Sequence, residues 1–217
     1  MTSYSLPDST GYPLDKKLDA IFQHKTNGFF IELGAHDGLT QSNSAFFEES
    51  RGWTGLLIEP SLSAYELCKT HRPKSICLNY ACVANDYTDK IVKGDFHGQT
   101  MCSVDGMRRQ DTHLVEVPAS TLEALLDKYA PSTPIDFLSL DTEGYEINIL
   151  KGLNLEKYRP TYMLIEIYKK DFREICEYLD AHNYRIHSNF TGYNPATNPL
   201  WDGTHNDYLF YDKHSGV

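Results

Sequence analysis

The sequence predicts an α/β fold built on a doubly wound, mostly parallel sheet, and three observations lead to this prediction. Short apolar runs recur along the chain, and each ends in a carboxylate. Runs of this length without polar alternation are typical of strands buried on both faces. Segments with helical spacing lie between them, and no repeat or linker divides the chain, so residues 1–217 are expected to form one domain. The four runs are 29–32, 56–59, 137–141 and 163–166.

The segments between the strands carry the spacing and start signals of amphipathic helices. Ser120 and Glu123 form a capping box, in which each side chain satisfies a backbone amide of the other. Apolar residues then follow one helix face over 122–129. A second box at 63–66 precedes a helix that is expected to end near residue 73. Two further helices are predicted over 144–151, with Glu143 as its cap, and over 172–179, after Asp171.

The two ends of the chain differ from its middle. Runs at 184–187 and 208–211 predict two strands with no helix between them, which fits an antiparallel closing pair. The long irregular segments 94–111 and 191–205 are expected to be active-site loops, because loops of this length in a compact domain are usually functional or disordered. Residues 1–27 are expected to be an N-terminal extension.

Composition excludes several classes of protein. A formal charge of −10 argues against nucleic acid as the main partner, and the short basic stretch at 72–74 reads as a solvated loop. The five cysteines form no CxxC pair, so buried free thiols are expected rather than metal ligands or a redox pair. No run approaches 18 apolar residues, and the N-terminus lacks a signal-peptide pattern, so a cytoplasmic protein without a membrane span is expected.

Four acids follow the apolar runs and are expected to meet at one edge of the sheet. In open α/β sheets, ligands bind beyond the carboxyl ends of the strands. Because neighbouring strands lie about 4.8 Å apart, uncompensated carboxylates there would raise one another's pKa. A cation, or a ligand with hydroxyls and positive charge, would relieve this repulsion. In the alternative interpretation, each acid caps the next helix or pairs with a local lysine. The four acids are Glu32, Glu59, Asp141 and Glu166.

The loop after the first strand is the most specific signal. Glu32 is followed by Gly34 and Gly38, while the glycine patterns of dinucleotide sites and P-loops are absent. Ser42-Asn43 is expected to open a helix whose amides favour a carboxylate. Glu59 stands where an acid takes two ribose hydroxyls. A ligand with a carboxylate, an amine and a ribose suggests S-adenosylmethionine, whereas the alternative is an ordinary glycine turn beside an incidental acid.

These segments resemble the FkbM family of S-adenosylmethionine-dependent methyltransferases. The similarity runs over roughly residues 28–167 and is carried by FFIELGAHDGLTQSN, GLLIEP, VPASTLEALL, IDFLSLDTEGYEINILKGL and MLIEI. The resemblance implies a Rossmann-like class I methyltransferase fold and O-methylation, commonly of sugar or secondary-metabolite hydroxyls. It places the methionine end of the cofactor at Glu32, Gly34, Ala35 and Gly38 with Asp37, Ser42 and Asn43 nearby, the ribose at Glu59, and the adenine near Ala81 and Cys82.

Methyl transfer to a hydroxyl also requires that the hydroxyl lose its proton. Asp141 and Glu166 end strands expected to be adjacent, and two carboxylates there would suit Mg²⁺ or Mn²⁺. Alternatively, Asp141 orients the cofactor amine and Glu166 holds a loop amide. His205 is the candidate general base, although a loop histidine is often only solvated. His36 is expected to shape the cofactor pocket.

Three functions are weighed on these observations. The first is an O-methyltransferase acting on a hydroxyl of a sugar or glycan. The second is a catalytically inactive docking module that binds the cofactor, and the intact glycine loop together with Glu59 speaks against it. The third is a methyltransferase for a non-sugar hydroxyl or a nucleic-acid ribose, which the charge of −10 disfavours for nucleic acid.

Overall fold

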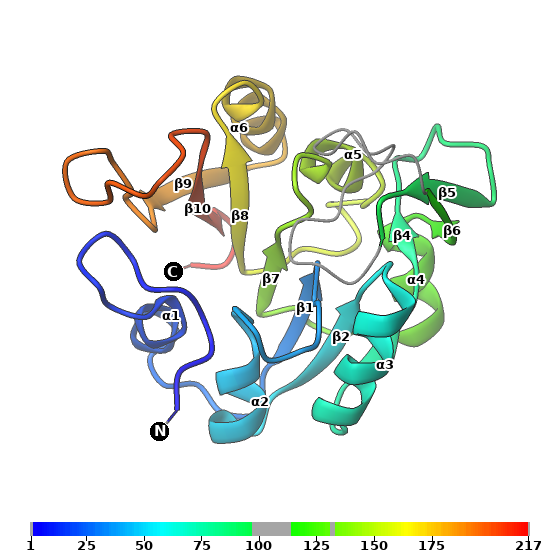
Figure 1. The fold of residues 1–217 in the computed structure, drawn as a ribbon, viewed down its shortest axis with the longest axis horizontal. Coiled ribbons are helices and arrows are strands. Elements are labelled where there is room, and N and C mark those ends of the chain that lie inside the picture. The colour runs from blue at the N-terminus through cyan, green and yellow to red at the C-terminus, as the bar shows by residue number, and fades with distance from the viewer. Residues whose placement is uncertain (1, 97–113, 131–132, 217) are drawn as a thin grey trace.

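A seven-stranded sheet forms the centre of the computed structural model, which describes residues 2–96, 114–130 and 133–216 (Figure 1). The strand order is β3-β2-β1-β7-β8-β10-β9. The first five strands are parallel, and β10 is antiparallel to both of its neighbours, which confirms the predicted closing pair. The strands are β1 (Phe29–Leu33), β2 (Thr54–Ile58), β3 (Ile76–Leu78), β7 (Phe137–Leu140), β8 (Tyr162–Tyr168), β9 (Tyr184–Asn189) and β10 (His205–Asp212).

The order in which the chain adds strands to the sheet reverses between β1 and β7. From β1 the chain moves outward through β2 to β3, and it later returns to pair β7 against the other side of β1 before adding β8. Connections therefore leave the carboxyl ends of β1 and β7 in opposite directions, and a crevice opens between them. The strand order thus places the predicted glycine loop at the switch point of the sheet.

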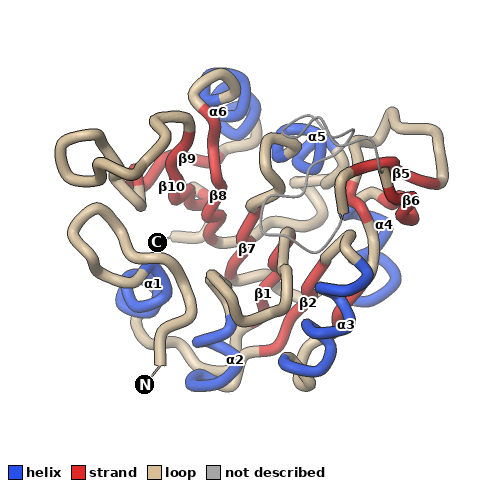
Figure 2. The backbone as a smooth tube through the Cα atoms, in the orientation of Figure 1, coloured by secondary structure: helices blue, strands red, loops and turns tan. Residues whose placement is uncertain are grey.

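A second, small sheet was not predicted from the sequence. It has the order β4-β6-β5 and lies beside α5 (Figure 2). Its strands give a weak sequence signal, since β4 has two residues, β5 has four, and β6 contains Pro118, a residue that is uncommon within strands. A separate apolar cluster that includes Val92, Phe96 and Val117 holds it together. The strands are β4 (Ala81–Cys82), β5 (Ile91–Gly94) and β6 (Val115–Ser120).

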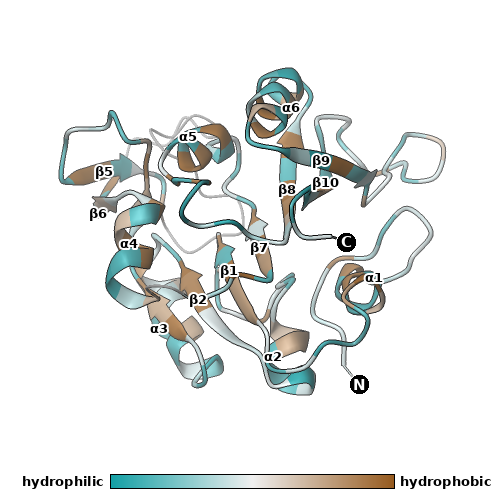
Figure 3. Ribbon diagram, turned by 180° about the vertical axis from the view of Figure 1, so that it is seen from behind, coloured by the Kyte–Doolittle hydropathy of each residue, from teal (hydrophilic) through white to brown (hydrophobic). Residues whose placement is uncertain are grey.

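Helices cover both faces of the central sheet. Alternate residues of the strands build two cores: Ile31, Leu138 and Ile165 belong to the core under α4, α5 and α6, whereas Phe30 and Phe137 belong to the one that α1 and α2 cover. Figure 3 shows apolar stretches along the central strands, while α3, α4 and α6 each combine apolar and polar residues. The helices are α1 (Leu14–Ile21), α2 (Ala45–Arg51), α3 (Leu62–His71), α4 (Leu122–Tyr129), α5 (Glu146–Lys151) and α6 (Phe172–Ala181).

The N-terminal residues expected to be an extension are packed into the core. Helix α1 was not predicted, and the ring of Phe22 directly after it lies 5.5 Å from the ring of Trp53 and 5.4 Å from that of Phe137. Burying such aromatic rings contributes strongly to core stability. Within the described ranges, no helix is both long and apolar enough to cross a membrane.

Three predicted helix caps are wrong by a few residues. Helix α4 is capped by the hydroxyl of Thr121 rather than by Ser120, and α3 is capped by Ser61 rather than by Ser63. Glu143 does not cap α5. Instead, the carboxylate of Glu146 accepts hydrogen bonds from the turn before the helix. In each case a second polar residue of the same type lies within three positions, and only the backbone path decides which one reaches the free amides.

Candidate active site

A cavity of about 950 Å³, counted out to its open mouth, lies at the carboxyl ends of β1, β2, β4 and β7. Eight of the ten residues predicted to contact the cofactor line it, while Asp37 and Gly38 do not. The eight are Glu32, Gly34, Ala35, Ser42, Asn43, Glu59, Ala81 and Cys82. Their assignment to the parts of a cofactor stays a prediction. Tyr80 before β4, Phe96 after β5 and the turn after β7 add to the wall.

Gly34, directly after β1, contacts the ends of both neighbouring strands, β2 and β7. It has a positive φ of 77°, and its amide donates to the carbonyl of Ile58. A Cβ at this position would lie 1.8 Å from the carbonyl oxygen of Asp141. Only glycine therefore fits, because any side chain would separate the ends of β1 and β7 and remodel the floor of the cavity.

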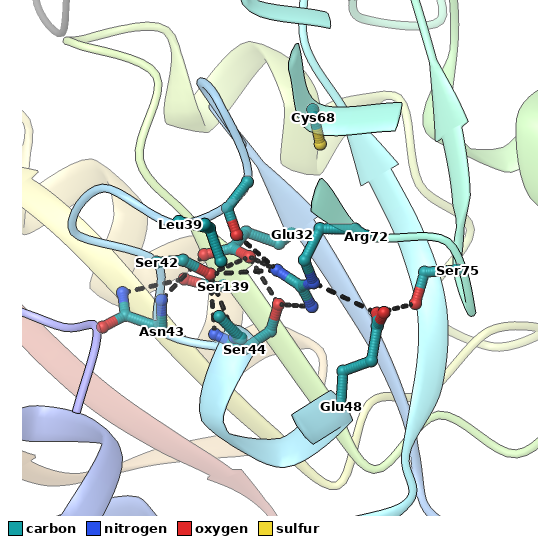
Figure 4. A network of polar contacts seen from close by, with 12 residues as sticks. Glu32, Leu39, Ser42, Asn43, Ser44, Glu48, Cys68, Arg72, Ser75 and Ser139 are labelled. Carbon is teal, nitrogen blue, oxygen red and sulfur yellow. Dashed lines mark hydrogen bonds and ion pairs between the residues drawn. The ribbon is translucent and has the colours of Figure 1, made fainter. Parts of the chain in front are cut away.

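Glu32 organises the loop that borders the cavity. Its carboxylate is buried and accepts hydrogen bonds from Ser42 Oγ at 2.8 Å, from the amide of Asn43 at 2.8 Å and from Ser44 Oγ at 2.5 Å (Figure 4). Three donors on one carboxylate fix the path of residues 42–44 before α2 begins. Glu32 thus acts on the cavity through the loop that it holds.

Arg72 supplies the cation that this network requires. The sequence placed it in a solvated loop, but its side chain is 2% exposed. Its Nη1 lies 3.8 Å from Glu32 Oε2, and its Nε donates to Glu48 Oε2 at 3.1 Å. The guanidinium also donates to the carbonyl of Gly38 at 2.8 Å and to Ser44 Oγ at 2.9 Å (Figure 4). Five fixed donors allow one arginine to neutralise and orient both acids.

Asp37 and Gly38 shape the loop from outside the cavity. Asp37 accepts hydrogen bonds from the amides of Leu39 and Thr40, which closes a local turn. Gly38 has a positive φ of 82° and packs against α3, where a Cβ would lie 3.0 Å from Cys68 Sγ. The predicted contacts of these two residues with the methionine end of a cofactor therefore have no counterpart in the lining of the cavity.

Asn43 is a lining residue of the cavity, and its side-chain amide contains a buried acceptor atom. Its Nδ2 donates to Ser139 Oγ at 3.1 Å, which orients the amide. Its Oδ1 is buried and has no hydrogen-bond partner within the part of the chain that the structure describes. A buried acceptor left without a donor costs stability, so a ligand with an N–H group would be favoured at this point.

Glu59 is a second polar anchor, directly after the carboxyl end of β2. It accepts hydrogen bonds from the amides of His36 and Ser61, each at 2.8 Å. Burial raises the pKa of this carboxyl, in keeping with its exposed fraction of only 6%. Two amides use only part of the acceptor capacity of a carboxylate, which has about four lone-pair sites. Hydroxyl donors from a ligand would offset the cost of burial.

The wall beyond Glu59 is mainly apolar and aromatic. Burial raises the pKa of the Cys82 thiol to about 12, so this side chain is a neutral part of the wall. A flat apolar surface of this kind suits a ring system such as a nucleobase. The sequence indicated only two residues here, although Tyr80 directly precedes them. The residues of this wall that sequence reasoning missed are Tyr80, Tyr145 and Ile149.

The four acids of the apolar runs occupy two kinds of position. Glu59 and Asp141 follow the last residue of a strand, whereas Glu32 and Glu166 lie inside β1 and β8. Only a sheet register can show this difference, because the apolar run and the hydrogen-bonded strand end at different residues. The expected row of four equivalent acids is therefore wrong.

Glu166 and His205 meet at the edge of the sheet beyond β8 and β10, and Asp141 follows the neighbouring strand β7. Leu140 pairs with Ile165, so the residues that follow them, Asp141 and Glu166, are neighbours as predicted. His205 begins β10, and its Nε2 lies 3.3 Å from Glu166 Oε1. Asp141 lines the cavity, and the Tyr168 hydroxyl beside His205 donates to Glu143 at 2.8 Å.

The donor set does not fit a divalent ion held by Asp141 and Glu166. Across residues 2–96, 114–130 and 133–216, no three His, Cys, Asp or Glu side chains are grouped so that they could hold one. Glu166 Oε1 faces the imidazole of His205. Two carboxylates without a third ligand give a weak site for Mg²⁺, which prefers octahedral oxygen coordination.

The two segments expected to be active-site loops differ in what the structure shows. Phe96, from the first of them, lines the cavity, while residues 97–111 lie outside the described residues. No residue of 191–205 lines the cavity. This second segment packs against the N-terminal residues, where Ser9 donates to the carbonyl of Thr191 at 2.7 Å, and the two loops lie side by side in Figures 1 and 3. Its role in acceptor binding stays a prediction.

Comparison with known proteins agrees with this geometry. The family description "Methyltransferase FkbM domain" matches residues 32–186. No curated protein sequence matches the chain.

Solved structures show the fold at low sequence identity. The METTL16 methyltransferase domain is 12% identical with a TM-score of 0.52, covering 92% of this chain and 66% of that one. The methyltransferase domain of bacterial CtHen1-C is 10% identical with a TM-score of 0.50, covering 91% and 96%. A Geobacter sulfurreducens SAM-dependent methyltransferase in complex with S-adenosyl-L-homocysteine is 10% identical, with a TM-score of 0.49 and coverage of 92% and 90%. The first two, together with the strand order, confirm the predicted Rossmann-like class I methyltransferase fold.

Proposed function

Since the chain belongs to the FkbM methyltransferase family, we propose that it is an S-adenosylmethionine-dependent O-methyltransferase that acts on a hydroxyl of a sugar or glycan. The observation that carries the proposal is the pair of polar anchors in one cavity. Asn43 offers an unsatisfied acceptor, and Glu59 offers a buried carboxylate with remaining lone pairs. An apolar wall adjoins them. The amine, ribose and adenine of the cofactor match these three features.

Each part of the cavity has a defined task in this proposal. Gly34 and Ala35 allow the backbone to approach the methionine end, and Asn43 Oδ1 accepts from its amine. Glu59 accepts from the two ribose hydroxyls, and Ala81 and Cys82 border the adenine. When bound, the cofactor supplies a methyl group on a sulfonium, which a nucleophile displaces in line. Positioning of the two reactants by the cavity then contributes much of the rate.

His205 is the proposed general base for the acceptor hydroxyl. Its Nε2 faces Glu166 Oε1 at 3.3 Å, so this carboxylate stabilises the imidazolium that forms. The proton is taken by Nδ1, which lies 2.9 Å from Thr204 Oγ1 and exchanges that hydroxyl for the acceptor hydroxyl. Asp141 lies at the border between this pair and the cofactor cavity, where it orients either the acceptor or the cofactor amine. A positioned base of this kind contributes about 10²–10⁴-fold to the rate.

The decisive experiment is calorimetric titration of S-adenosylhomocysteine into wild type, Glu59→Ala and Asn43→Ala. We expect micromolar binding that falls at least about tenfold in each variant, because one lost hydrogen bond to a charged group accounts for about 1.5–3 kcal/mol. Glu66→Ala is the matched control, since Glu66 is an exposed acid on α3. Absence of binding by folded wild type would overturn the proposal.

A second experiment separates the enzyme from the docking module. Wild type is incubated with methyl-labelled cofactor and a panel of sugars, glycans, small alcohols and RNA, with and without Mg²⁺ or Mn²⁺. Label on a sugar oxygen supports the proposal, and label on nitrogen, carbon or RNA ribose replaces the acceptor class. Binding of the cofactor without transfer to any acceptor favours the docking module. A metal requirement lost in Asp141→Ala would restore the metal hypothesis.

A further inference from the structure

Two cysteines that the proposed chemistry does not use face each other beside the cofactor loop. Cys68 is buried on α3 and Cys77 is half-buried on β3, and their sulfur atoms lie 3.6 Å apart. A disulfide requires about 2.05 Å between the sulfurs, so they must approach by roughly 1.5 Å. A short turn joins α3 to β3, at the edge of the sheet. A small movement of the helix end is therefore enough.

The surroundings of the pair shift the pKa values of the two thiols in opposite directions. The hydrogen bond from Cys68 lowers the pKa of Cys77, and the positive charge of Arg72 acts in the same direction. The same hydrogen bond and burial raise the pKa of Cys68. Cys77 is thus the more acidic and the more accessible thiol of the two, while Cys68 is the less acidic one. A thiolate with a neighbouring thiol is the arrangement of a redox-responsive dithiol.

We infer that Cys68 and Cys77 are a modification site: they are oxidised by peroxide to a disulfide that weakens cofactor binding. The thiolate form of Cys77 attacks one peroxide oxygen, and the O–O bond breaks. Hydroxide departs, and Cys77 becomes a sulfenic acid. The sulfur of Cys68 then attacks the sulfur of Cys77. The S–S bond forms, the S–O bond breaks, and the proton of Cys68 leaves with the oxygen as water. Two thiols are oxidised and one peroxide is reduced.

The link to the cofactor loop runs through the face of α3 that carries Cys68. A Cβ on Gly38 would lie 3.0 Å from Cys68 Sγ, so the loop rests directly against this sulfur. Arg72, four residues later and on the same side of α3, donates to the carbonyl of Gly38 and to Ser44 Oγ (Figure 4). Drawing Cys68 toward β3 displaces this face from the loop that borders the cavity. This part of the inference rests on the proposed function.

Peptide mapping of the whole chain after treatment with hydrogen peroxide tests the modification itself. We expect a disulfide-linked peptide pair containing Cys68 and Cys77 in wild type, reversed by dithiothreitol. Cys77→Ser and Cys68→Ala should not form it. Cys176→Ser is the matched control, because Cys176 is another half-buried thiol and its loss should leave the link intact. Absence of the link in folded wild type and in Cys176→Ser would overturn the inference.

Titration of S-adenosylhomocysteine into the same samples tests the coupling. We expect the Kd of wild type to rise about fivefold or more on oxidation and to return on reduction, whereas the Kd of Cys77→Ser should not respond to peroxide. An unchanged Kd in the linked protein would overturn the coupling. Failure of the reduced protein to bind would instead overturn the proposed function, and the peptide map would still decide whether the dithiol exists.

Discussion

The two sides of the crevice are built in different ways. On the side of β1 and β2, buried acids are surrounded by amides, hydroxyls and one arginine, as at Glu32, Glu59 and Arg72. On the side of β8 and β10, His205 and Glu166 meet across two antiparallel strands near the surface. The first side is set before a ligand arrives, whereas the second consists of side chains gathered from separate strands. In the proposed function, the first side holds the cofactor and the second side serves the acceptor.

The largest expected effect comes from a substitution at Gly34, at the floor of the cavity on the side of β1 and β2. Gly34→Ala places a Cβ 1.8 Å from the carbonyl oxygen of Asp141, so β1 and β7 must separate. We expect loss of measurable S-adenosylhomocysteine binding and destabilisation by more than about 4 kcal/mol. Gly203→Ala is the control, because Gly203 also has a positive φ but no atom within 4 Å of its Cβ position. It should cost about 1–2 kcal/mol in urea unfolding, and equal costs for both would contradict the steric argument.

The second effect tests whether the arginine holds the loop. Arg72→Met leaves Glu32 and Glu48 buried without their cation, so we expect a loss of about 3–5 kcal/mol in the free energy of unfolding. Arg173→Met removes an exposed pair with Glu177 and should leave the free energy of unfolding almost unchanged. Urea denaturation measures both. A small loss in Arg72→Met would mean that water replaces the guanidinium in the network.

The third effect comes from a substitution of His205, which acts only on the side of β8 and β10. His205→Gln should lower kcat by about 10²–10⁴-fold once an acceptor is known. The Kd for S-adenosylhomocysteine should stay within a factor of about two, since His205 does not line the cavity. His187→Gln, on the exposed face of β9, is the matched control. A parallel loss of cofactor affinity in His205→Gln would show that the two sides are not separable.

The smallest effect concerns pH. Burial raises the pKa of Asp207, which pairs with Glu166 in the sheet, from 3.8 to about 6. The folded state therefore holds this proton more tightly than the unfolded chain, and the stabilisation is complete below about pH 3.8 and is lost as the pH rises through about 6. Asp207→Asn should stabilise the protein by about 1–3 kcal/mol at pH 7.5, and by much less at pH 4.5. Asp89→Asn, at an exposed position, is the control for the substitution itself, and thermal unfolding measures both variants.

Local chemistry was readable in the sequence where one residue type is obligatory. Gly34 is such a position, and the apolar runs located β1, β2, β7 and β8 because a strand buried on both faces tolerates little else. Two-residue β4 left no periodic signal. Arg72 was misplaced because nothing in its neighbours along the chain shows that two acids surround it in the fold.

The sequence by itself determined the strand pattern, the glycine loop and most of the residues around the cavity, because each depends on chemistry within a few neighbouring positions. The tertiary structure alone decided which polar groups satisfy one another. Asn43 meets Ser139 from a distant strand, and His205 meets Glu166 across a register that pairs β10 with β8. Such contacts depend on the three-dimensional path of the backbone, which closes loops of many residues, and no spacing along the chain encodes their geometry.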